Sequence, residues 1–314
     1  MENLNLIDLH CDTFLAIVTA AKEGKTISLK ENDLHVDINK LKKVGASAQM
    51  FAAFTPVESL SKGDFDGTPY DFFKIIYNKM ISELENNRAD IALATDYEDY
   101  KKNMSQEKIS AFLTVEEGAI LDNKIERVDE IYKMGFRFLG LIWMPENCIG
   151  FSNSKNPELM ARGLKPFGFE VIERANDLGM IIDVSHLSDG GFYDVAKHSK
   201  KPFVATHSNC RALANETRNL TDDMIKTLAD KGGVMGLNLL PDFLDASKKS
   251  RVKFMIKHIQ HIRNVGGIDT VAIGADFDGM GGDLEIDNVG DMDKLFMALA
   301  DNGFTSDEID KIAY

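Results

Sequence analysis

The feature that most constrains the fold of this chain is a series of eight short apolar runs. Each run has the length and the β-branched or aromatic content of a buried parallel strand. In order along the chain, the runs are residues 4–9, 48–54, 111–115, 138–143, 180–184, 203–206, 233–237 and 271–274. Between them lie amphipathic stretches, for example residues 70–86 and 167–178, with the periodicity of helices that pack on a core. This alternation predicts a parallel sheet whose strands are joined by helices.

Eight strands that alternate with helices over 314 residues favour a (β/α)8 TIM barrel over an open sheet. No G-x-G-x-x-G fingerprint follows the first run, which argues against a dinucleotide-binding sheet. No internal repeat or proline-rich linker divides the sequence, so we expect residues 1–314 to form a single barrel domain. Because the helical pattern still runs at Tyr314, we also expect that a short C-terminal segment is missing from this sequence.

The charge and the cysteine content argue against several classes of protein. The chain has 36 basic and 50 acidic side chains and a net charge of -14, the wrong sign for a protein that binds nucleic acid. Its three cysteines lie far apart, so neither a disulfide framework nor a four-cysteine zinc module is expected. The sequence has no basic and apolar leader and no apolar run of about 18 residues. We therefore expect a cytoplasmic protein without membrane attachment.

Histidines follow three of the predicted strands at the point where each strand ends. His10 and Asp12 follow the first strand, His186 follows the fifth and His207 follows the sixth. In a parallel barrel the carboxyl ends of the strands meet at one rim, where catalytic groups collect. Taken alone, each histidine is more simply explained as a hydrogen-bonded polar residue, and Asp12 as a helix cap. Three of only seven histidines at three strand ends instead favour a shared metal site.

Carboxylates are predicted at the same rim. Glu116 and Glu117 end the third predicted strand, where only one of two adjacent side chains can point inward, and Asp276 follows the eighth. Imidazole and carboxylate ligands without a set of thiolates suit zinc, with manganese or cobalt as replacements. Cys11 and Cys210 neighbour the proposed ligands. Because no base is placed beside them, we expect both cysteines to pack as small apolar side chains.

Six motifs resemble those of the membrane (renal) dipeptidase family, within the wider group of amidohydrolase-like metal-dependent barrels. They are residues 8–12 (DLHCD), 115–118 (VEEG), 183–186 (DVSH), 206–213 (THSNCRAL), 218–222 (RNLTD) and 274–279 (GADFDG). The similarity extends over nearly the whole chain. It implies a (β/α)8 barrel of the metal-dependent hydrolase type that acts as a zinc-dependent metallo-dipeptidase. A homodimer is a further expectation from the family.

The resemblance also implies the metal ligands. Two zinc ions are expected in each chain, with His10 and Asp12 on one ion, His186 and His207 on the other, and Glu116 bridging both. Glu117 is then a bystander beside the bridging carboxylate.

Three further residues are implied to contact substrate. The resemblance makes Arg218 the anchor for a substrate carboxylate, which suits the guanidinium fork, and places Asp276 opposite the reacting centre and the substrate amine. Without the resemblance, Arg218 would be interpreted as a surface arginine. Trp143 stands where the mammalian family has a substrate-contacting histidine, and it can be either packing at the rim or one wall of a substrate pocket. Its presence shifts transition-state stabilisation to the metal or to another donor.

The sequence therefore predicts a zinc-dependent dipeptidase in which two metals share a hydroxide that attacks the dipeptide carbonyl. Asp276 would orient the amine or pass the proton to the leaving nitrogen. One alternative is another amidohydrolase-like activity, such as hydrolysis of a lactone, a cyclic imide or a phosphotriester. The H-x-D motif at His10 and the lack of a lysine near Trp143 oppose it. The other alternative is a catalytically silent barrel that only binds metal, which the full set of ligands makes less favourable.

Overall fold

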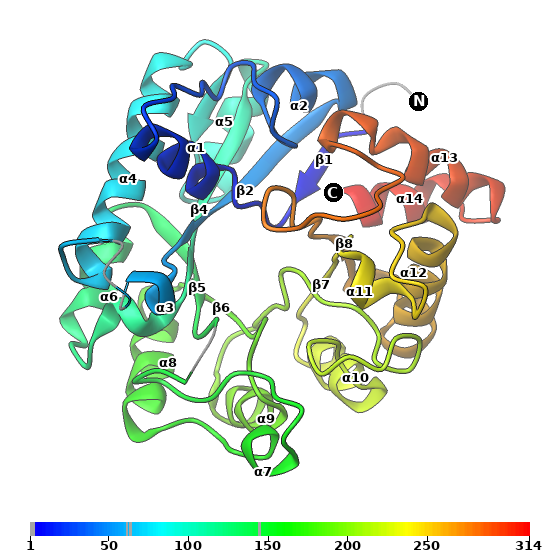
Figure 1. Ribbon diagram of the computed structural model, residues 1–314. Coiled ribbons are helices and arrows are strands. Elements are labelled where there is room, and N and C mark those ends of the chain that lie inside the picture. The colour runs from blue at the N-terminus through cyan, green and yellow to red at the C-terminus, as the bar shows by residue number, and fades with distance from the viewer. Residues whose placement is uncertain (1–3, 61, 63–64, 144–145) are drawn as a thin grey trace.

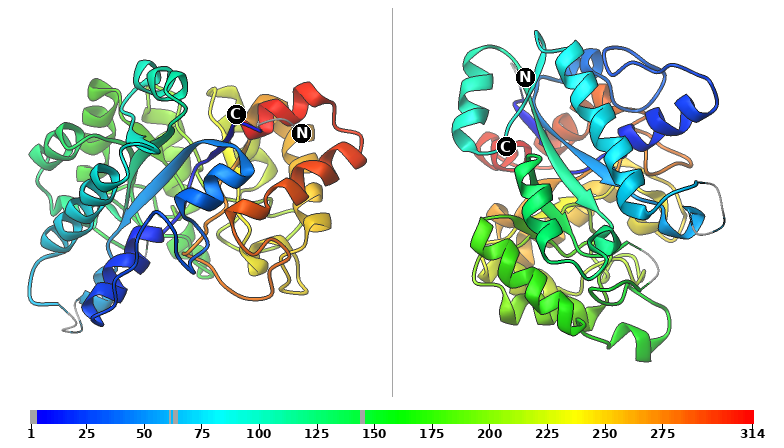
Figure 2. Two further views of the ribbon diagram at one scale, coloured as in Figure 1. Left: turned by 90° about the horizontal axis from the view of Figure 1, so that it is seen from above. Right: turned by 90° about the vertical axis from the view of Figure 1, so that its left-hand side faces the viewer.

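Parallel strands curl around a central axis, with helices outside them, in the computed structural model of residues 4–60, 62, 65–143 and 146–314 (Figure 1). Two further views show the same arrangement from the side (Figure 2). The strands are β1 (Leu6–Asp8), β2 (Ala46–Phe54), β3 (Ile91–Leu93), β4 (Ile109–Glu116), β5 (Phe136–Gly140), β6 (Ile181–Asp183), β7 (Met235–Leu237) and β8 (Val271–Ile273). All pairings between these strands are parallel.

The sheet closes into a barrel through a short segment at residues 203–206. The strands are ordered β6-β5-β4-β2-β1-β8-β7, and the segment fills the gap between the two ends of this row. The Val204 amide donates to the Ile182 carbonyl at 2.9 Å, and the Ala205 amide donates to the Val234 carbonyl at 3.0 Å. Parallel bridges join Val204 to β6 and Ala205 to β7. The predicted sixth strand therefore completes the (β/α)8 barrel, although it is too short to form a regular ladder.

One strand was missed by the sequence analysis. β3 pairs with the first half of β4, from Ile91↔Ile109 to Leu93↔Ala111, and β5 pairs with the second half. Both lie on the edge of β4 that faces away from β2. Three residues are too few to show a strand period, so this addition to the barrel was not apparent from the pattern.

The helices begin and end at ordinary sequence signals. Both predicted helical stretches are present, as α4 (Pro69–Asn86) and α8 (Pro166–Leu178). Thr68 and Asp71 form a capping box at the start of α4, and α8 ends at Gly179, whose φ is 77°. The remaining helices are α1 (Thr13–Lys22), α2 (Ile38–Val44), α3 (Val57–Ser59), α5 (Tyr97–Ser105), α6 (Glu126–Lys133), α7 (Pro157–Met160), α9 (Asp189–His198), α10 (Asp222–Asp230), α11 (Pro241–Leu244), α12 (Val252–Gly266), α13 (Asp293–Asp301) and α14 (Ser306–Ala313). In the described parts of the chain, no helix is both long and apolar enough to cross a bilayer.

A small apolar cluster lies inside the barrel. It contains Leu9, Met50, Phe138 and Val204, all at most 7% exposed, and it is separate from the larger core between strands and helices. Leu9 directly follows β1, and the other three lie in β2, β5 and the 203–206 segment. These elements are not all neighbours, so their side chains can meet only inside the ring. The same four residues line a cavity of about 380 Å³, while the polar side chains that follow the strands collect at the carboxyl rim.

Two glycines let the 203–206 segment enter the barrel. A Cβ on Gly236 would lie 1.9 Å from the Thr206 carbonyl oxygen, and a Cβ on Gly274 would lie 1.7 Å from the same atom. Neither distance is possible for real atoms, and the obstacle is backbone that cannot rotate away. A side chain at either position would push out the segment that carries Thr206.

We expect Gly236→Ala to lower the free energy of unfolding by about 1–3 kcal/mol, because the added methyl group must displace backbone in a packed interior. Urea denaturation of the purified protein measures the change. Gly281→Ala is the control, since a Cβ there meets nothing within 4 Å. Equal unfolding midpoints for the two variants would contradict this account of the barrel closure.

Candidate active site

The rim of the barrel holds a buried group of side chains around His10. The Nε2 atom of His10 lies 3.3 Å from a Glu116 oxygen, 3.5 Å from an Asp12 oxygen and 3.9 Å from an Asp276 oxygen. His10, Asp12 and Glu116 are buried, and the Asp276 side chain is 13% exposed. His10 and Asp12 follow β1, Glu116 ends β4, and Asp276 follows β8, so three strand ends converge on one point.

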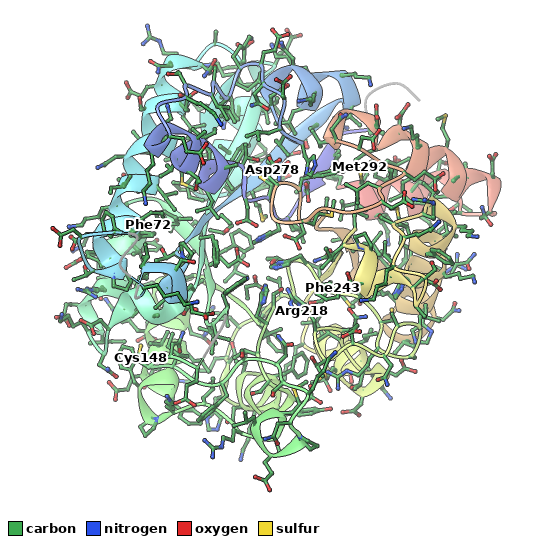
Figure 3. The ribbon with its side chains drawn as sticks, in the orientation of Figure 1. Phe72, Cys148, Arg218, Phe243, Asp278 and Met292 are labelled. Carbon is green, nitrogen blue, oxygen red and sulfur yellow. The ribbon has the colours of Figure 1, made fainter. Side chains whose placement is uncertain are left out.

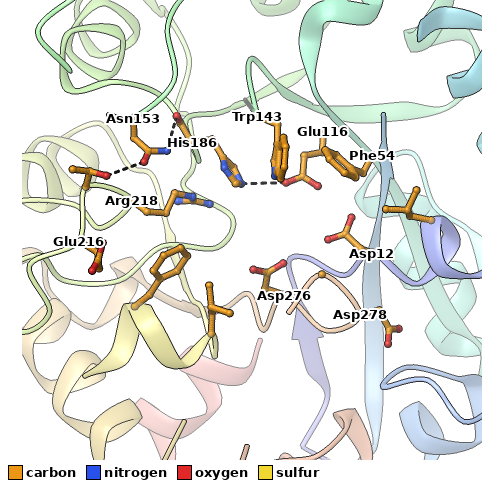
Figure 4. Close-up of a pocket in the computed structure, with 15 residues that line it drawn as sticks. Asp12, Phe54, Glu116, Trp143, Asn153, His186, Glu216, Arg218, Asp276 and Asp278 are labelled. Carbon is orange, nitrogen blue, oxygen red and sulfur yellow. Dashed lines mark hydrogen bonds and ion pairs between the residues drawn. The ribbon is translucent and has the colours of Figure 1, made fainter. Parts of the chain in front are cut away.

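A second group forms around the other two predicted histidines. The Nε2 atoms of His186 and His207 are 2.9 Å apart, and His186 Nε2 lies 3.2 Å from the second oxygen of Glu116. Glu116 thus presents one oxygen to His10 and the other to His186. The contact between Glu116 and His186 is drawn in Figure 4. The structure brings together all five residues that the sequence analysis proposed as metal ligands.

The donors of this site fit a divalent cation. His10 Nε2 and Asp12 Oδ1 are buried and have no hydrogen-bond partner among the described residues, a costly state unless an absent ligand completes it. Burial, with the neighbouring charge of Asp12, raises the pKa of Glu116 to about 8. Burial and nearby positive charge hold the pKa values of His186 and His207 well below the usual range. The neutral imidazoles of His186 and His207 are in the state that binds a metal. In contrast, the charges of Glu116 and Asp12, against the effect of burial, raise the pKa of His10 well above the usual range.

Left-handed backbone places two of these side chains. His186 has a φ of 69° and Asp276 a φ of 66°, conformations that are unfavourable outside glycine. Asn238 holds Asp276 by donating from Nδ2 to Oδ2 at 2.9 Å. Nearby, a Cβ on Gly279 would lie 2.1 Å from an Asp12 oxygen and 2.6 Å from an Asp276 oxygen. Only glycine at this position leaves both carboxylates in place.

A chain of hydrogen bonds orients His207. The Thr206 hydroxyl donates to Asp183 Oδ2 at 2.5 Å and lies 2.8 Å from His207 Nδ1. Because the hydroxyl has one proton and directs it to Asp183, it accepts its other hydrogen bond from Nδ1–H. The Nε2 atom of His207 is then unprotonated and faces Glu116 and His186, as a metal-binding imidazole requires.

Arg218 lies inside the pocket and not on the surface. It is 6% exposed, its Nη1 donates to the Ser208 hydroxyl at 2.7 Å, and its Nε and Nη2 have no partner within the described chain. Burial lowers its pKa to about 10. In Figure 4 the side chain extends toward His186. Two unsatisfied N–H groups on a buried guanidinium are suited to an anionic ligand.

A second arginine, not singled out from the sequence, holds the loop of Arg218. Arg211 forms a two-point ion pair with Asp189, at 2.7 and 2.8 Å, at the start of α9. The same guanidinium donates to the carbonyls of Thr217 and Asn219, on either side of Arg218. From the sequence, Arg211 was only one residue of the 206–213 motif, with no role of its own. Its position seven residues before Arg218 was the one indication that it could support the Arg218 loop.

Glu117 supports the wall of the pocket and does not face the site. Its carboxylate accepts from the Ala119 amide, the Trp143 amide and the Asn147 side chain at 2.8, 3.1 and 2.6 Å. The indole of Trp143 packs against Phe54, with ring centres 4.7 Å apart. Trp143 thus packs at the rim and also lines the cavity, and Glu117 fixes its backbone.

The cavity has a volume of about 390 Å³. Its lining residues are Asp12, Leu15, Phe54, Glu116, Trp143, Asn153, His186, Glu216, Thr217, Arg218, Leu240, Phe243, Asp276, Asp278 and Gly279. Figure 3 shows Arg218, Phe243 and Asp278 around the centre of the barrel mouth. The thiols of Cys11 and Cys210 are buried outside this cavity and face backbone carbonyls. The pocket is large enough for a small molecule and combines one cationic group with several carboxylates.

Comparison with known proteins gives a consistent set of similarities. The model of the family described as Membrane dipeptidase (Peptidase family M19) matches residues 1–314. Over 218 residues, the chain is 34% identical to an uncharacterised protein encoded in the region 5′ of pqqA in Klebsiella pneumoniae. That alignment covers 67% of this chain and 80% of the relative.

Two solved structures have the same fold. One is dipeptidase AC, a metallopeptidase of family M19, with a TM-score of 0.90, 24% identity and coverage of 100% of this chain and 96% of the other. The other is a metallopeptidase from Rhodobacter sphaeroides with a bound phosphinate mimic of the dipeptide L-Ala-D-Ala. It has a TM-score of 0.89 and 22% identity, and the match covers 100% of this chain and 97% of that protein.

We expect Thr206→Val to weaken zinc binding by about 10- to 100-fold, because His207 loses the hydroxyl that orients its ring. Competition with a chromophoric chelator measures the affinity. Thr206→Ser keeps the hydroxyl and is the matched control, which we expect to bind zinc nearly as tightly as the unmutated protein. If valine and serine at this position gave the same affinity, the hydrogen-bond chain would not support the site.

Proposed function

This chain belongs to the membrane dipeptidase family of metallopeptidases, and from that premise we propose that it hydrolyses dipeptides with two zinc ions. The observation that carries the proposal is the position of Glu116, which presents one oxygen to His10 and the other to His186. The buried Arg218 opens onto the same cavity. A paired metal site beside a fixed cation suits a short substrate with a free carboxylate.

We assign the five converging side chains as the metal ligands. His10 and Asp12 would hold one ion, His186 and His207 the other, and Glu116 both. Three imidazoles and two carboxylates are a nitrogen and oxygen set that zinc accepts. When bound, the ions supply Lewis-acid activation of water and of the peptide carbonyl.

Arg218 would bind the C-terminal carboxylate of the dipeptide. Its Nε and Nη2 have no hydrogen-bond partner among the described residues, and a substrate carboxylate can accept from both in parallel. Its Nη1 is already held by Ser208, so the guanidinium is oriented before substrate arrives. Fixing one end of the substrate in this way places the peptide bond at the metal ligands and disfavours substrates that extend beyond this carboxylate.

Asp276 would carry the proton of the reaction. Burial raises its pKa to about 6. A carboxyl group with a pKa close to the pH of the reaction can both accept and release a proton. Asn238 binds Oδ2, while Oδ1 lies 3.9 Å from His10 Nε2 and faces the site. Oδ1 is therefore the atom that would contact the substrate amine or return a proton to the leaving nitrogen.

Trp143 would bound the side of the pocket that takes the N-terminal residue. It lies with Phe54 beside Glu116 and away from Glu216 (Figure 4), so it offers an apolar wall near the reacting end. An indole face cannot donate a hydrogen bond to an oxyanion. Stabilisation of the transition state then depends on the ions and on other donors of the site.

We expect the zinc-loaded protein to cleave small dipeptides, to lose the activity when a chelator removes the metal, and to regain it with added zinc. The substrates should include L-Ala-L-Ala and L-Ala-D-Ala, since a similar structure holds a mimic of the latter. Elemental analysis should find two ions per chain, and fewer in Glu116→Gln, which loses the shared anionic ligand. Metal-replete protein that cleaves none of the dipeptides would contradict the proposed activity.

We expect Arg218→Ala to lower kcat/KM for L-Ala-L-Ala by about 10- to 100-fold, the loss of one charge-assisted hydrogen-bonding group. The C-terminal amide of the same dipeptide should be a poor substrate of the unmutated enzyme and little affected by the substitution. Arg218→Lys keeps the charge but not the planar fork, so its kcat/KM for L-Ala-L-Ala should lie between those of the unmutated enzyme and Arg218→Ala. Equal kinetics on free and amidated dipeptide in the unmutated enzyme would argue against this role of Arg218.

A further inference from the structure

The substrate pocket holds a carboxylate that the proposed reaction does not use. Among the described residues that line the cavity, five carry a carboxylate and only Arg218 carries a permanent positive charge. Three of these carboxylates surround His10. A fourth, Asp278, accepts from the Thr13 hydroxyl at 2.6 Å and so serves the loop structure. Glu216 is the fifth, and it neither lies beside His10 nor holds the loop of Asp278.

The surroundings of Glu216 leave its charge available to a ligand. Within the described chain, its carboxylate has one ion pair, at 3.9 Å from the Nζ of Lys155. The Lys155 side chain is 84% exposed and that of Glu216 is 34% exposed, so water screens this pair and it contributes little. Inside the pocket, Glu216 and a bound cation would be less hydrated than Glu216 and Lys155 are at the surface. The attraction between Glu216 and the bound cation would therefore be stronger.

Glu216 also has a defined position relative to Arg218. It stands two residues before Arg218 in the loop that Arg211 clamps. In Figure 4, Glu216 lies on the side of Arg218 that faces away from Glu116 and Asp12. The buried guanidinium, with two N–H groups lacking a partner in the described chain, separates the acidic outer end of the pocket from the reacting centre.

We propose that Glu216 binds the side chain of the C-terminal residue of the substrate, and that this enzyme prefers dipeptides that end in lysine or arginine. The inference rests on the proposed function, because it takes the substrate carboxylate to lie on Arg218. The side chain of that residue leaves the same Cα as the carboxylate and therefore starts beside Arg218. Its methylene groups can lie on the apolar lining of the cavity, where the Phe243 ring centre is 5.9 Å from the Arg218 guanidinium carbon, while its charged end reaches Glu216.

The test compares two substrates that differ mainly in one charge. L-Ala-L-Lys and L-Ala-L-norleucine have the same straight side chain, and only lysine carries the ammonium group. We expect kcat/KM of the unmutated enzyme to be about two- to fivefold higher for the lysine dipeptide, in the range of a partly exposed ion pair. Glu216→Gln should bring this ratio close to one while it leaves hydrolysis of the norleucine dipeptide nearly unchanged. Added salt should reduce the ratio in the unmutated enzyme.

Glu170→Gln is the matched control variant. Glu170 lies in α8, is exposed and does not line the cavity. We expect this variant to keep the preference for lysine. L-Ala-L-Glu should show the opposite effect, because Glu216 repels its side chain. We expect Glu216→Gln to raise kcat/KM for this dipeptide.

Binding of the free amino acids gives a readout that does not depend on turnover. By calorimetry, L-lysine should bind the zinc-loaded protein more tightly than L-norleucine, and Glu216→Gln should remove the difference. A ratio near one in the unmutated enzyme, or an equal loss on both dipeptides in Glu216→Gln, would overturn the inference. If neither dipeptide were cleaved, the dipeptidase function would fail, and the calorimetric comparison would still decide whether Glu216 selects a cationic side chain.

Discussion

A buried carboxylate, Glu116, lies between His10 and the pair of His186 and His207, and the proposed metal site depends on its position. Its oxygens lie 3.3 Å from His10 and 3.2 Å from His186. Glu116 ends β4, which pairs with β2, β3 and β5 and is thus held along both edges. The residue shared by both groups is placed by the strand with the most partners in the sheet, which limits how far the two groups can move apart.

Two other buried aspartates tie the neighbouring strand ends together beneath the site. Asp8 of β1 accepts from the Ala275 amide at 2.8 Å, just before Asp276. Asp183 of β6 accepts from the Thr206 amide at 3.0 Å, just before His207. Each aspartate thus links one strand end to the next segment that carries a site residue. Burial raises the pKa of Asp8 to about 6 despite these bonds, so a cation above it would also lower the cost of burying this charge.

Much of the architecture was predictable from the sequence because strand period and strand-end chemistry are local properties. The eight apolar runs correspond to the eight positions of the barrel, and the rule that parallel strands end at one rim is enough to bring His10, Glu116 and His207 together. β3 was missed because three residues show no period. The part played by Arg211 could not be predicted, since its contacts to Asp189 and to the Arg218 loop depend on how the loop folds. The same holds for Glu216, which in sequence is one acidic residue among many.

The residues that we propose as metal ligands and those that we propose to select the substrate lie on different parts of the fold. The proposed ligands lie at or directly after strands, where the sheet sets their backbone, whereas Trp143 and Glu216 lie on loops. Each loop is nevertheless held by a partly buried contact to its backbone: Glu117 accepts from the Trp143 amide, and Arg211 donates to the Thr217 carbonyl, next to Glu216. A side chain in the pocket can therefore change without moving the backbone or the ligands. This is a physical reason why barrels of this kind keep one metal site while their substrates differ.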